Sequence, residues 1–408
     1  MSSEPARDAL AGLKVLDFCW VVAGPMATRY LAVHGAAVVR IESRHRPDVM
    51  RGANPYRDGV PHPERSGYYA WHNTDKYNFS LNMRHSRARE VVHRLVRWAD
   101  VVTENFTPGT MEEWALGFDD LRKIKQEIIM VSASMLGRGG PHAAQPGFGI
   151  VLTSLAGLTH VTGAPGRLPI TPFGAYTDFI VPKFIVAATL AAVDHRNRTG
   201  RGVYLDFSQL EAVLHFVTPT LLDYAVNGRV KEREGNRHPA AAPHGVYPCR
   251  AEDSWCAIAC FTEGEWAALC DVLKRPEWAR DPRFARLVAR KAHEEALDAA
   301  LAERTREWPA RDLMVALQGA GVPAGVVADS RDLFEDPQLQ HRGHFTVVDH
   351  PELGPHAVDT PEFHLSRTPF RIRWSAPLLG QHTEHVCREI LGMSEAEYLE
   401  LAAAGVLE

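Results

Sequence analysis

An apolar segment, a glycine-proline turn, a helical segment and a second apolar segment follow one another near the start of the chain. Leu13–Phe18 (LKVLDF) has the length and apolar character of a buried strand. Gly24-Pro25 begins the helical stretch, with proline at a first-turn position whose N–H needs no partner. Gly35 ends this stretch before a second strand at Ala37–Ile41. Strand, helix and strand in this order form a βαβ unit, so the sequence predicts a parallel sheet.

The same alternation continues toward the middle of the chain, and the expected elements are helix Arg87–Trp98, strands Asp100–Thr103 and Ile128–Ser132, an apolar helix Asp178–Arg196, strand Val203–Phe207 and helix Ser208–Val226. Residues 227–248 are rich in proline and glycine, which favours a linker or a functional loop. The expected later elements are strand Trp255–Cys260 and helices near Gly264–Leu273, His293–Arg304 and Pro309–Ala320. From about Asp332 we expect loops until a last helix near Glu384–Leu391.

Composition narrows the class of protein. A length of 408 residues with 45% hydrophobic and 23% charged residues is typical of a soluble protein of two domains. The net charge of -5 gives no general attraction to nucleic acid or to an anionic membrane, so neither is expected as a partner. The first residues lack the apolar core of a signal peptide. The apolar run Phe179–Val193 is short for a membrane span and contains Pro182 and Lys183. A cytoplasmic location follows as an expectation.

Motif searches exclude several common chemistries. The chain has no P-loop, no G-x-G-x-x-G after its first strand, no G-x-S-x-G and no H-E-x-x-H. Its six cysteines form no Cys-x-x-Cys pair, so we expect no metal site. Composition and pattern alone therefore indicate a cytoplasmic α/β enzyme and do not identify its activity.

Six segments in collinear order resemble the class III CoA-transferases, the group that includes formyl-CoA transferase, carnitine CoA-transferase and the α-methylacyl-CoA racemases. The most specific one contains an aspartate, an apolar helix, R-x-R-T-G-x-G and D-x-S-x-x-E-A. The matching segments are Leu13–Ser43, His72–Met83 (HNTDKYNFSLNM), Ala99–Glu112 (ADVVTENFTPGTME), Pro172–Leu214, Ala320–Val327 with Asp336–Phe345, and Ala376–Thr383. Within this group, PFGAYTDF and the segment Gly235–Cys249 look most like the benzylsuccinate-type transferases.

The resemblance implies an α/β fold with a Rossmann-like large domain and an inserted smaller α/β domain. The large domain would comprise residues 1–226 and 330–408, and the small domain, with its flanking linkers, residues 227–329. Members of the family form interlocked dimers, so the expected assembly is an interlocked homodimer, or a heteromer with a related chain.

The resemblance also implies that Asp178 is the nucleophile, because this residue precedes the long apolar helix as the family's catalytic aspartate does. A carboxylate can attack an acyl-CoA thioester to give a mixed anhydride, which the CoA thiolate then converts into an aspartyl-CoA thioester. The partners would be an acyl-CoA and a carboxylic acid, with succinyl-CoA as a plausible donor. Coenzyme A is then a substrate, and no bound cofactor is expected. The plain alternative is that Asp178 only caps its helix.

Family members hold CoA beside the first strand, the Glu-Asn-Phe segment and a basic group after the second strand. These places correspond here to a set of predicted CoA contacts: Val21, Val22, Arg44, Arg51, Lys76, Asn105 and Phe106. Arg46 is also available after the second strand. A substrate pocket is predicted from Phe148, His244 and Tyr247.

Two departures from the family pattern bear on the reaction. Formyl-CoA transferase has a glutamine where this chain has Val22, and a valine there suits a larger and less polar acid than formate or oxalate. The expected acceptor is a medium-sized carboxylic acid, such as an aromatic or branched one. The racemases carry a histidine and an aspartate where this chain has Phe148 and Gly149, and phenylalanine cannot transfer a proton. Racemisation, or service as one subunit of a heteromeric transferase, remain the alternatives to a self-sufficient transferase.

Overall fold

A computed structural model describes residues 8–408 of the chain. Two compact units divide it. The first comprises the chain up to Thr159 together with Thr171–Val230 and His341–Glu408, and the second comprises His160–Ile170 and Lys231–Gln340. The sequence predicts residues 227–329 for the smaller domain. The second unit of the structure extends beyond that range and also takes up a separate segment from the middle of the chain.

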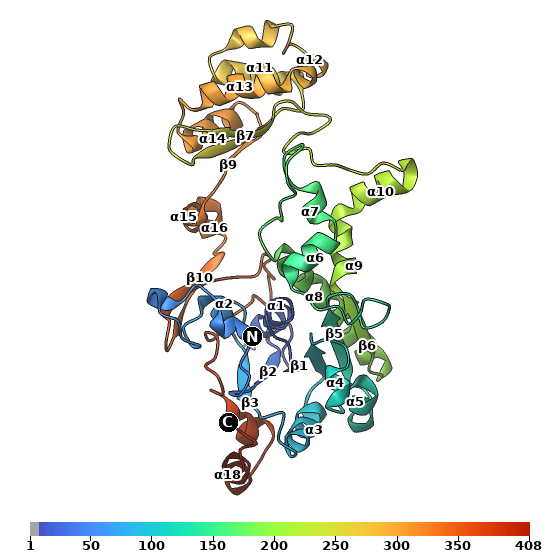
Figure 1. Cartoon of the computed structure of the whole chain (residues 1–408). Helices are drawn as coiled ribbons and strands as arrows, with labels where there is room; N and C mark the ends of the chain where they lie inside the picture. Colours follow the sequence, from blue (N-terminus) through green and yellow to red (C-terminus); the bar gives the residue numbers. More distant parts are fainter. Residues whose placement is uncertain (1–7) are drawn as a thin grey trace. The chain divides into compact units, whose positions relative to one another are not determined.

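A six-stranded parallel sheet in the order β3-β2-β1-β4-β5-β6 organises the first unit (Figure 1). This is the strand order of the doubly wound nucleotide-binding folds, in which the direction of winding reverses between the first and fourth strands. The strands are β1 Lys14–Asp17, β2 Ala37–Glu42, β3 Tyr77–Ser80, β4 Val101–Glu104, β5 Ile129–Ser134 and β6 Tyr204–Ser208. The predicted βαβ unit and its parallel sheet are confirmed.

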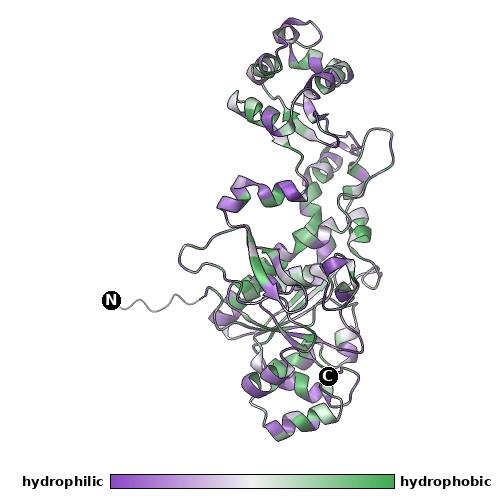
Figure 2. Cartoon of the chain, turned by 90° about the vertical axis from the view of Figure 1, so that its left-hand side faces the viewer, coloured by the Kyte–Doolittle hydropathy of each residue, from purple (hydrophilic) through white to green (hydrophobic). Residues whose placement is uncertain are grey.

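Each strand supplies side chains to two separate cores, because successive residues of a strand point to opposite faces of the sheet. Val15 and Val38 pack on one face with α1 and α8, whereas their neighbours Leu16 and Val39 pack on the other face with α3 and the C-terminal helix α18. Most helices carry both hydrophobic and hydrophilic stretches, as helices that cover a core with one face should (Figure 2). The helices of this unit are α1 Ala23–Val33, α2 Gly67–Trp71, α3 Ala88–Trp98, α4 Thr110–Glu113, α5 Phe118–Ile124, α6 Gly149–Leu155, α8 Tyr176–Thr199, α9 Gln209–Leu214, α10 Thr218–Asn227, α17 Thr383–His385 and α18 Glu395–Ala403. Helix α7, Leu158–Val161, begins in this unit and ends in the second.

The second unit has its own core around a three-stranded antiparallel sheet in the order β7-β8-β9. Its strands and helices are β7 His244–Pro248, β8 Trp255–Ala259, β9 Ala324–Val326, α11 Glu263–Val272, α12 Leu287–Ala292, α13 Glu294–Thr305, α14 Ala310–Gly319, α15 Ser330–Glu335 and α16 Pro337–His341. Strand β7 lies at the end of the segment that the sequence predicts to be a loop, so that prediction was wrong for its last five residues.

Two further predictions of local structure were wrong. The expected single helix Ser208–Val226 is interrupted by a 3-10 turn at His215–Val217, and α10 starts again with Pro219 in its first turn, where the missing N–H costs no hydrogen bond. Ser208 is nevertheless the N-cap of α9, because its hydroxyl accepts the Glu211 N–H. The segment expected to be mostly loop contains the hairpin β10 Phe345–His350 and β11 Gly354–Asp359, and α18 follows the last predicted helix.

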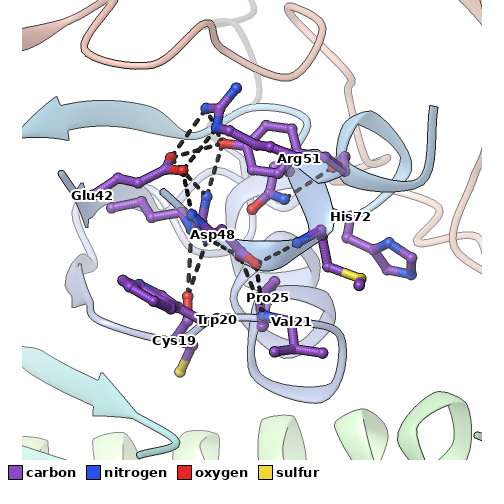
Figure 3. Close-up of polar contacts among 12 residues, drawn as sticks. Cys19, Trp20, Val21, Pro25, Glu42, Asp48, Arg51 and His72 are labelled. Atoms are coloured by element: carbon purple, nitrogen blue, oxygen red, sulfur yellow. Dashed lines mark hydrogen bonds and ion pairs between the residues drawn. The ribbon is translucent and has the colours of Figure 1, made fainter. Parts of the chain in front are cut away.

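A buried cluster of charges fills the carboxyl end of β2 (Figure 3). The Glu42 carboxylate accepts hydrogen bonds from Arg51 Nε at 2.7 Å and Nη2 at 3.0 Å, and lies 3.2 Å from Arg40 Nη1. Arg40 also pairs with Asp48, whose N–H donates to Glu42 Oε1 at 2.9 Å. Tyr69 Oη accepts from both guanidinium groups. These bonds fix residues 42–51, the connection that leaves β2 beside the N-terminus of α1.

Replacing Glu42 with glutamine tests this cluster. Burial would raise the pKa of Glu42, but Arg40 and Arg51 together lower it to about 2. Removing one member of a buried pair leaves the other charges uncompensated, so we expect Glu42→Gln to lower the free energy of unfolding by about 3–5 kcal/mol at pH 7. Since the ionised form is favoured in the folded state, the difference from wild type should narrow as the pH falls from about 4.5 toward 2.

Thermal and urea denaturation would measure the effect, with Glu400→Gln as the matched control. Glu400 pairs with Arg87 at 2.7 Å on the surface, where both side chains are exposed. The control should be indistinguishable from wild type. Equal stability of both variants would contradict a structural role for the cluster.

Candidate active site

Asp178 lies in the first turn of α8, one of the helices that cover the sheet. Its N–H donates to the Ala175 carbonyl oxygen at 2.8 Å, and α8 is anchored in the core by Val181 and Ile185. Pro182 lies four residues further along and has no N–H, so the Asp178 carbonyl receives no helical hydrogen bond from it. The predicted placement of Asp178 at the start of an apolar helix is confirmed.

A cavity of about 130 Å³ opens beside the Asp178 carboxylate. It lies at the carboxyl ends of β1, β4 and β5, next to the point where the sheet reverses its winding, which is where ligands bind in folds of this type. Its lining residues are Val21, Val22, Ala23, Asn105, Met135, Gly147, Phe148, Gly149, Leu152, Asp178 and Gln209.

The Asp178 carboxylate is poorly solvated. Burial raises its pKa to about 6, and no hydrogen-bond donor among residues 8–408 reaches it. Gly149 approaches so closely that a Cβ atom at this position would lie 2.5 Å from Asp178 Oδ2 and 2.5 Å from Ala175 Cβ. Only glycine fits there with the present geometry. A half-buried carboxylate without donors is a reactive one, because little stabilises its negative charge.

The turn between β1 and α1 faces Asp178 across this cavity. Asn105 Oδ1 accepts the Trp20 N–H at 2.8 Å, and Asn105 Nδ2 donates to the Trp20 carbonyl at 2.8 Å. Val21 has φ 70°, a left-handed conformation that a β-branched residue rarely adopts. Its N–H donates to both carboxylate oxygens of Asp48, at 3.1 and 3.3 Å (Figure 3). The turn is therefore held by side chains from two other loops.

Helix α1 begins at this turn, and its N-cap Val22 and first residue Ala23 line the cavity. Gly24 allows the helix to start here, because a Cβ on it would lie 2.5 Å from Cys19 Cβ and 2.6 Å from its Sγ. The positive end of α1 and the negative carboxylate of Asp178 thus line one small space.

A second cavity of about 390 Å³ is lined by Trp20. It is walled by aromatic rings, with ring centroids of Trp20 and Phe106 5.8 Å apart and those of Phe106 and Trp114 5.5 Å apart. The guanidinium of Arg46 lies 5.5 Å from the Trp20 ring centroid, and His45 and Arg84 add basic groups at the rim. Aromatic walls beside cationic groups suit a planar base that carries phosphates.

The structure brings most of the predicted site residues to these two cavities. Val21, Val22, Asn105 and Phe148 line the cavity with Asp178, and Phe106 lines the larger one. Phe148 is 69% exposed, so its ring is open to a ligand. Asn105 lines the cavity, but both polar atoms of its amide form hydrogen bonds to the Trp20 backbone.

Arg51 and Lys76 lie elsewhere, in the interior. Arg51 belongs to the charge cluster of Glu42, and Lys76 Nζ donates to the Pro25 carbonyl at 2.8 Å and contacts Asp17 at 3.4 Å. Burial lowers the pKa of Lys76 to about 8. Both cations are fully buried, which argues against the predicted contact with CoA phosphates. Arg44 is exposed near the larger cavity but is not part of its lining.

His244 and Tyr247 belong to the second unit. Tyr247 is a core residue, 3% exposed, whose hydroxyl donates to Asp298 Oδ1 at 2.7 Å, which argues against the predicted contact with substrate. His244 is half-buried and stacks on His238 with ring centroids 5.2 Å apart.

Sequence reasoning missed several residues near the two cavities. Trp20 follows the first strand directly, and its position beside the predicted Val21 could have identified it. No sequence pattern points to Arg84 or Gln209, because each lies in a segment whose composition is typical of an ordinary surface or helix. Tyr68 lies near enough to Asp178 for the carboxylate charge, after burial, to raise the pKa of its hydroxyl.

Comparison with known proteins identifies relatives over nearly the whole chain. Residues 10–383 match the family described as CoA-transferase family III. The chain is 32% identical over 407 residues to a succinyl-CoA–D-citramalate CoA-transferase of Chloroflexus aurantiacus, with 100% of both chains covered. It is 31% identical to the beta subunit of a succinyl-CoA–L-malate CoA-transferase of the same organism, with 98% of both chains covered.

A solved structure of a CAIB/BAIF family protein from Brucella suis superposes with a TM-score of 0.86 at 30% identity, covering 94% of this chain and 100% of that one. The fold, the cavity at the carboxyl edge of the sheet and the extent of these matches agree. This chain belongs to CoA-transferase family III and is a class III CoA-transferase.

Proposed function

We propose that this enzyme transfers CoA from succinyl-CoA to a short dicarboxylic acid, with Asp178 as the covalent nucleophile. The observation that carries the proposal is the Asp178 carboxylate, which is half-buried, has no donor among residues 8–408 and lines a cavity with the N-terminus of α1. The alternative role of Asp178 as a helix cap does not explain its position, because its side chain accepts no N–H at the start of α8.

The proposed reaction proceeds through covalent steps on Asp178. A carboxylate oxygen attacks the thioester carbonyl of succinyl-CoA, the carbon–sulfur bond breaks, and a mixed anhydride forms. The released CoA thiolate attacks the aspartyl carbonyl, so succinate leaves and Asp178 carries CoA as a thioester. The acceptor carboxylate repeats the two steps in reverse, and the free Asp178 carboxylate is regenerated with the new acyl-CoA.

Each attack produces a negatively charged oxygen that needs donors. The N–H groups of Val22 and Ala23 open α1 beside the cavity, where a helix N-terminus favours negative charge. Their positions are fixed before reaction by the Asn105 and Asp48 contacts to the turn. The small volume of the cavity limits the water available to hydrolyse the anhydride.

The larger cavity is the proposed place of the CoA nucleotide. Trp20 and Phe106 would stack on the base, and Arg46 and Arg84 would neutralise phosphates. Val21 lines the cavity of Asp178 and directly follows Trp20, which lines the larger cavity, so the pantetheine chain would pass Val21 on the way to Asp178. This assignment replaces Arg51 and Lys76 as the phosphate contacts.

The acid acceptor is proposed from the relatives. Their names specify D-citramalate and L-malate, which are dicarboxylic acids related to succinate. A benzylsuccinate-type acid, which the sequence resemblance suggests, is also a substituted succinate. A short dicarboxylic acid is therefore consistent with both the relatives and the resemblance. A monocarboxylic aromatic acid is the alternative that they support less.

Racemisation is disfavoured by the geometry around Asp178. A second base would have to lie across the substrate from it, and the corresponding places hold Phe148 and Gly149. No aspartate fits at position 149 without movement of Ala175 or Asp178.

The proposed assembly is an interlocked homodimer in the cytoplasm. One helix, α8, is long and apolar enough to cross a membrane by composition, and a third of its apolar window is buried within the chain. Exposed apolar side chains also gather on α10, among them Leu222 and Tyr224. A second copy would cover such surfaces. Pairing with a related chain is the alternative, since one relative is named as a beta subunit.

Covalent labelling tests the nucleophile. After incubation with succinyl-CoA, hydroxylamine should convert the aspartyl thioester into a hydroxamate that peptide mass spectrometry maps to Asp178. Asp178→Asn should remain folded, carry no label and lose turnover by at least about 10³-fold. Asp194→Asn, an exposed carboxylate on the same helix, is the matched control and should label as wild type does. A label elsewhere in the wild type would contradict the mechanism.

The pH dependence of turnover tests the state of Asp178. Its pKa is raised to about 6 by burial, and the nucleophile must be ionised, so activity is lost as the pH falls through 6. We expect kcat/KM at pH 5 to be about tenfold below its plateau above pH 7. Initial rates in buffers of constant ionic strength would give the pH profile of kcat/KM. A profile that is flat down to pH 4.5 would contradict the raised pKa.

A panel of acceptor acids tests the substrate class. With succinyl-CoA as donor, malate, citramalate and benzylsuccinate should be converted with kcat/KM at least about 100-fold above butyrate and benzoate, because a second carboxylate requires its own binding partners. Chromatography of the acyl-CoA products would measure conversion. Preference for benzoate or another monocarboxylic acid would reject the dicarboxylate while leaving the role of Asp178 intact.

A further inference from the structure

Asp48 holds a turn that its own residues do not favour. Val21 has φ 70°, and a β-branched side chain is strained in this conformation. The Val21 N–H donates to both Asp48 carboxylate oxygens, and these are the hydrogen bonds that tie Val21 to the rest of the fold (Figure 3). The next residue, Val22, is the N-cap of α1, and both Val22 and Ala23 line the cavity of Asp178. The strain therefore lies one residue away from the groups that face the nucleophile.

The Asp48 carboxylate is itself fixed from several sides. It pairs with Arg40, accepts the Met50 N–H at 2.9 Å and is 1% exposed as a residue. Arg40 is fully buried and is held in turn by Glu42 at 3.2 Å. A charged group this firmly placed can keep a strained turn in one conformation, whereas a mobile surface acid could not.

We propose that Asp48 is a positioning residue for the transfer reaction: it keeps Val21 left-handed and thereby aims the first N–H groups of α1 at the oxyanions formed on Asp178. The proposal rests on the proposed function of Asp178. Without Asp48, Val21 relaxes toward negative φ, the N–H groups turn away, and the covalent step slows although CoA still binds.

A rescue experiment separates this role from a purely structural one. Glycine adopts positive φ without strain, so Val21→Gly lets the turn reach its active conformation without the help of Asp48. A general loss of stability from the unpaired Arg40 would not be repaired by that change. The matched control is Lys274→Gly, which also replaces a residue of positive φ (56°) but lies in the second unit.

The measured quantity is the single-turnover rate of the Asp178 adduct with saturating succinyl-CoA. Asp48→Asn and Asp48→Glu should each slow it about 10- to 100-fold, with KM for succinyl-CoA changed by less than about threefold. Asp48→Asn removes the charge, and Asp48→Glu keeps the charge beside Arg40 but displaces the acceptor. Adding Val21→Gly to either variant should restore the rate at least about threefold, and adding Lys274→Gly should restore none.

Several results would overturn the proposal. Adduct formation within about twofold of wild type in both Asp48 variants would remove the positioning role. Equal recovery with both glycine substitutions would show a general effect on stability. Failure of both Asp48 variants to fold, with or without Val21→Gly, would assign Asp48 to the core alone. Absence of an adduct in the wild type is a different outcome, which would reject the proposed function of Asp178 itself.

Discussion

Glu42 joins the buried charged side chains at the end of β2 into one cluster. Its carboxylate lies between the two buried arginines, and a second carboxylate, Asp48, completes the balance. Two guanidinium groups this close would repel each other without it. The cluster does more than stabilise the end of β2. It determines the course of residues 43–52, and these residues both shape the larger cavity and supply the acceptor for the Val21 N–H.

The turn after β1 connects the two halves of the site. On one side, Trp20 forms a wall of the larger cavity, and on the other, Val22 and Ala23 line the space around Asp178. Asn105 and Asp48 hold the same turn from the loops after β4 and β2. A ligand that extends from an adenine ring to a thioester would contact both sides of a single rigid element. The separation of the larger cavity from Asp178 is thus set by the local geometry of this turn.

Much of the fold follows from the sequence, because alternating apolar strands and amphipathic helices leave few arrangements for a parallel sheet. The start of α1 and the Asp178 helix were predicted for physical reasons that the structure bears out. The break between α9 and α10 was missed, since Pro219 is compatible with a helical first turn and with a continuous apolar pattern. The hairpin β10–β11 was missed because its proline and glycine residues resemble loop composition.

The site was less predictable than the fold. Arg51 and Lys76 were assigned to CoA from the resemblance, in which a basic group after the second strand contacts the phosphates. No pattern in one sequence reveals that both cations are buried with partners. The pairs that bury them join residues from different parts of the chain, such as Lys76 with Asp17. Asp178 was found from the sequence resemblance, and its unpaired, desolvated state became visible only in three dimensions.

The close approach of Gly149 to Asp178 has a consequence for how new activities could arise on this scaffold. Position 149 can hold either a glycine in close contact with Asp178 or a residue whose side chain transfers protons, because the space does not admit both. A laboratory attempt to evolve an epimerase from this protein would therefore meet a barrier at its first step. Any single acidic or basic replacement at this position would displace the very carboxylate it is meant to assist, so helix α8 would have to shift first.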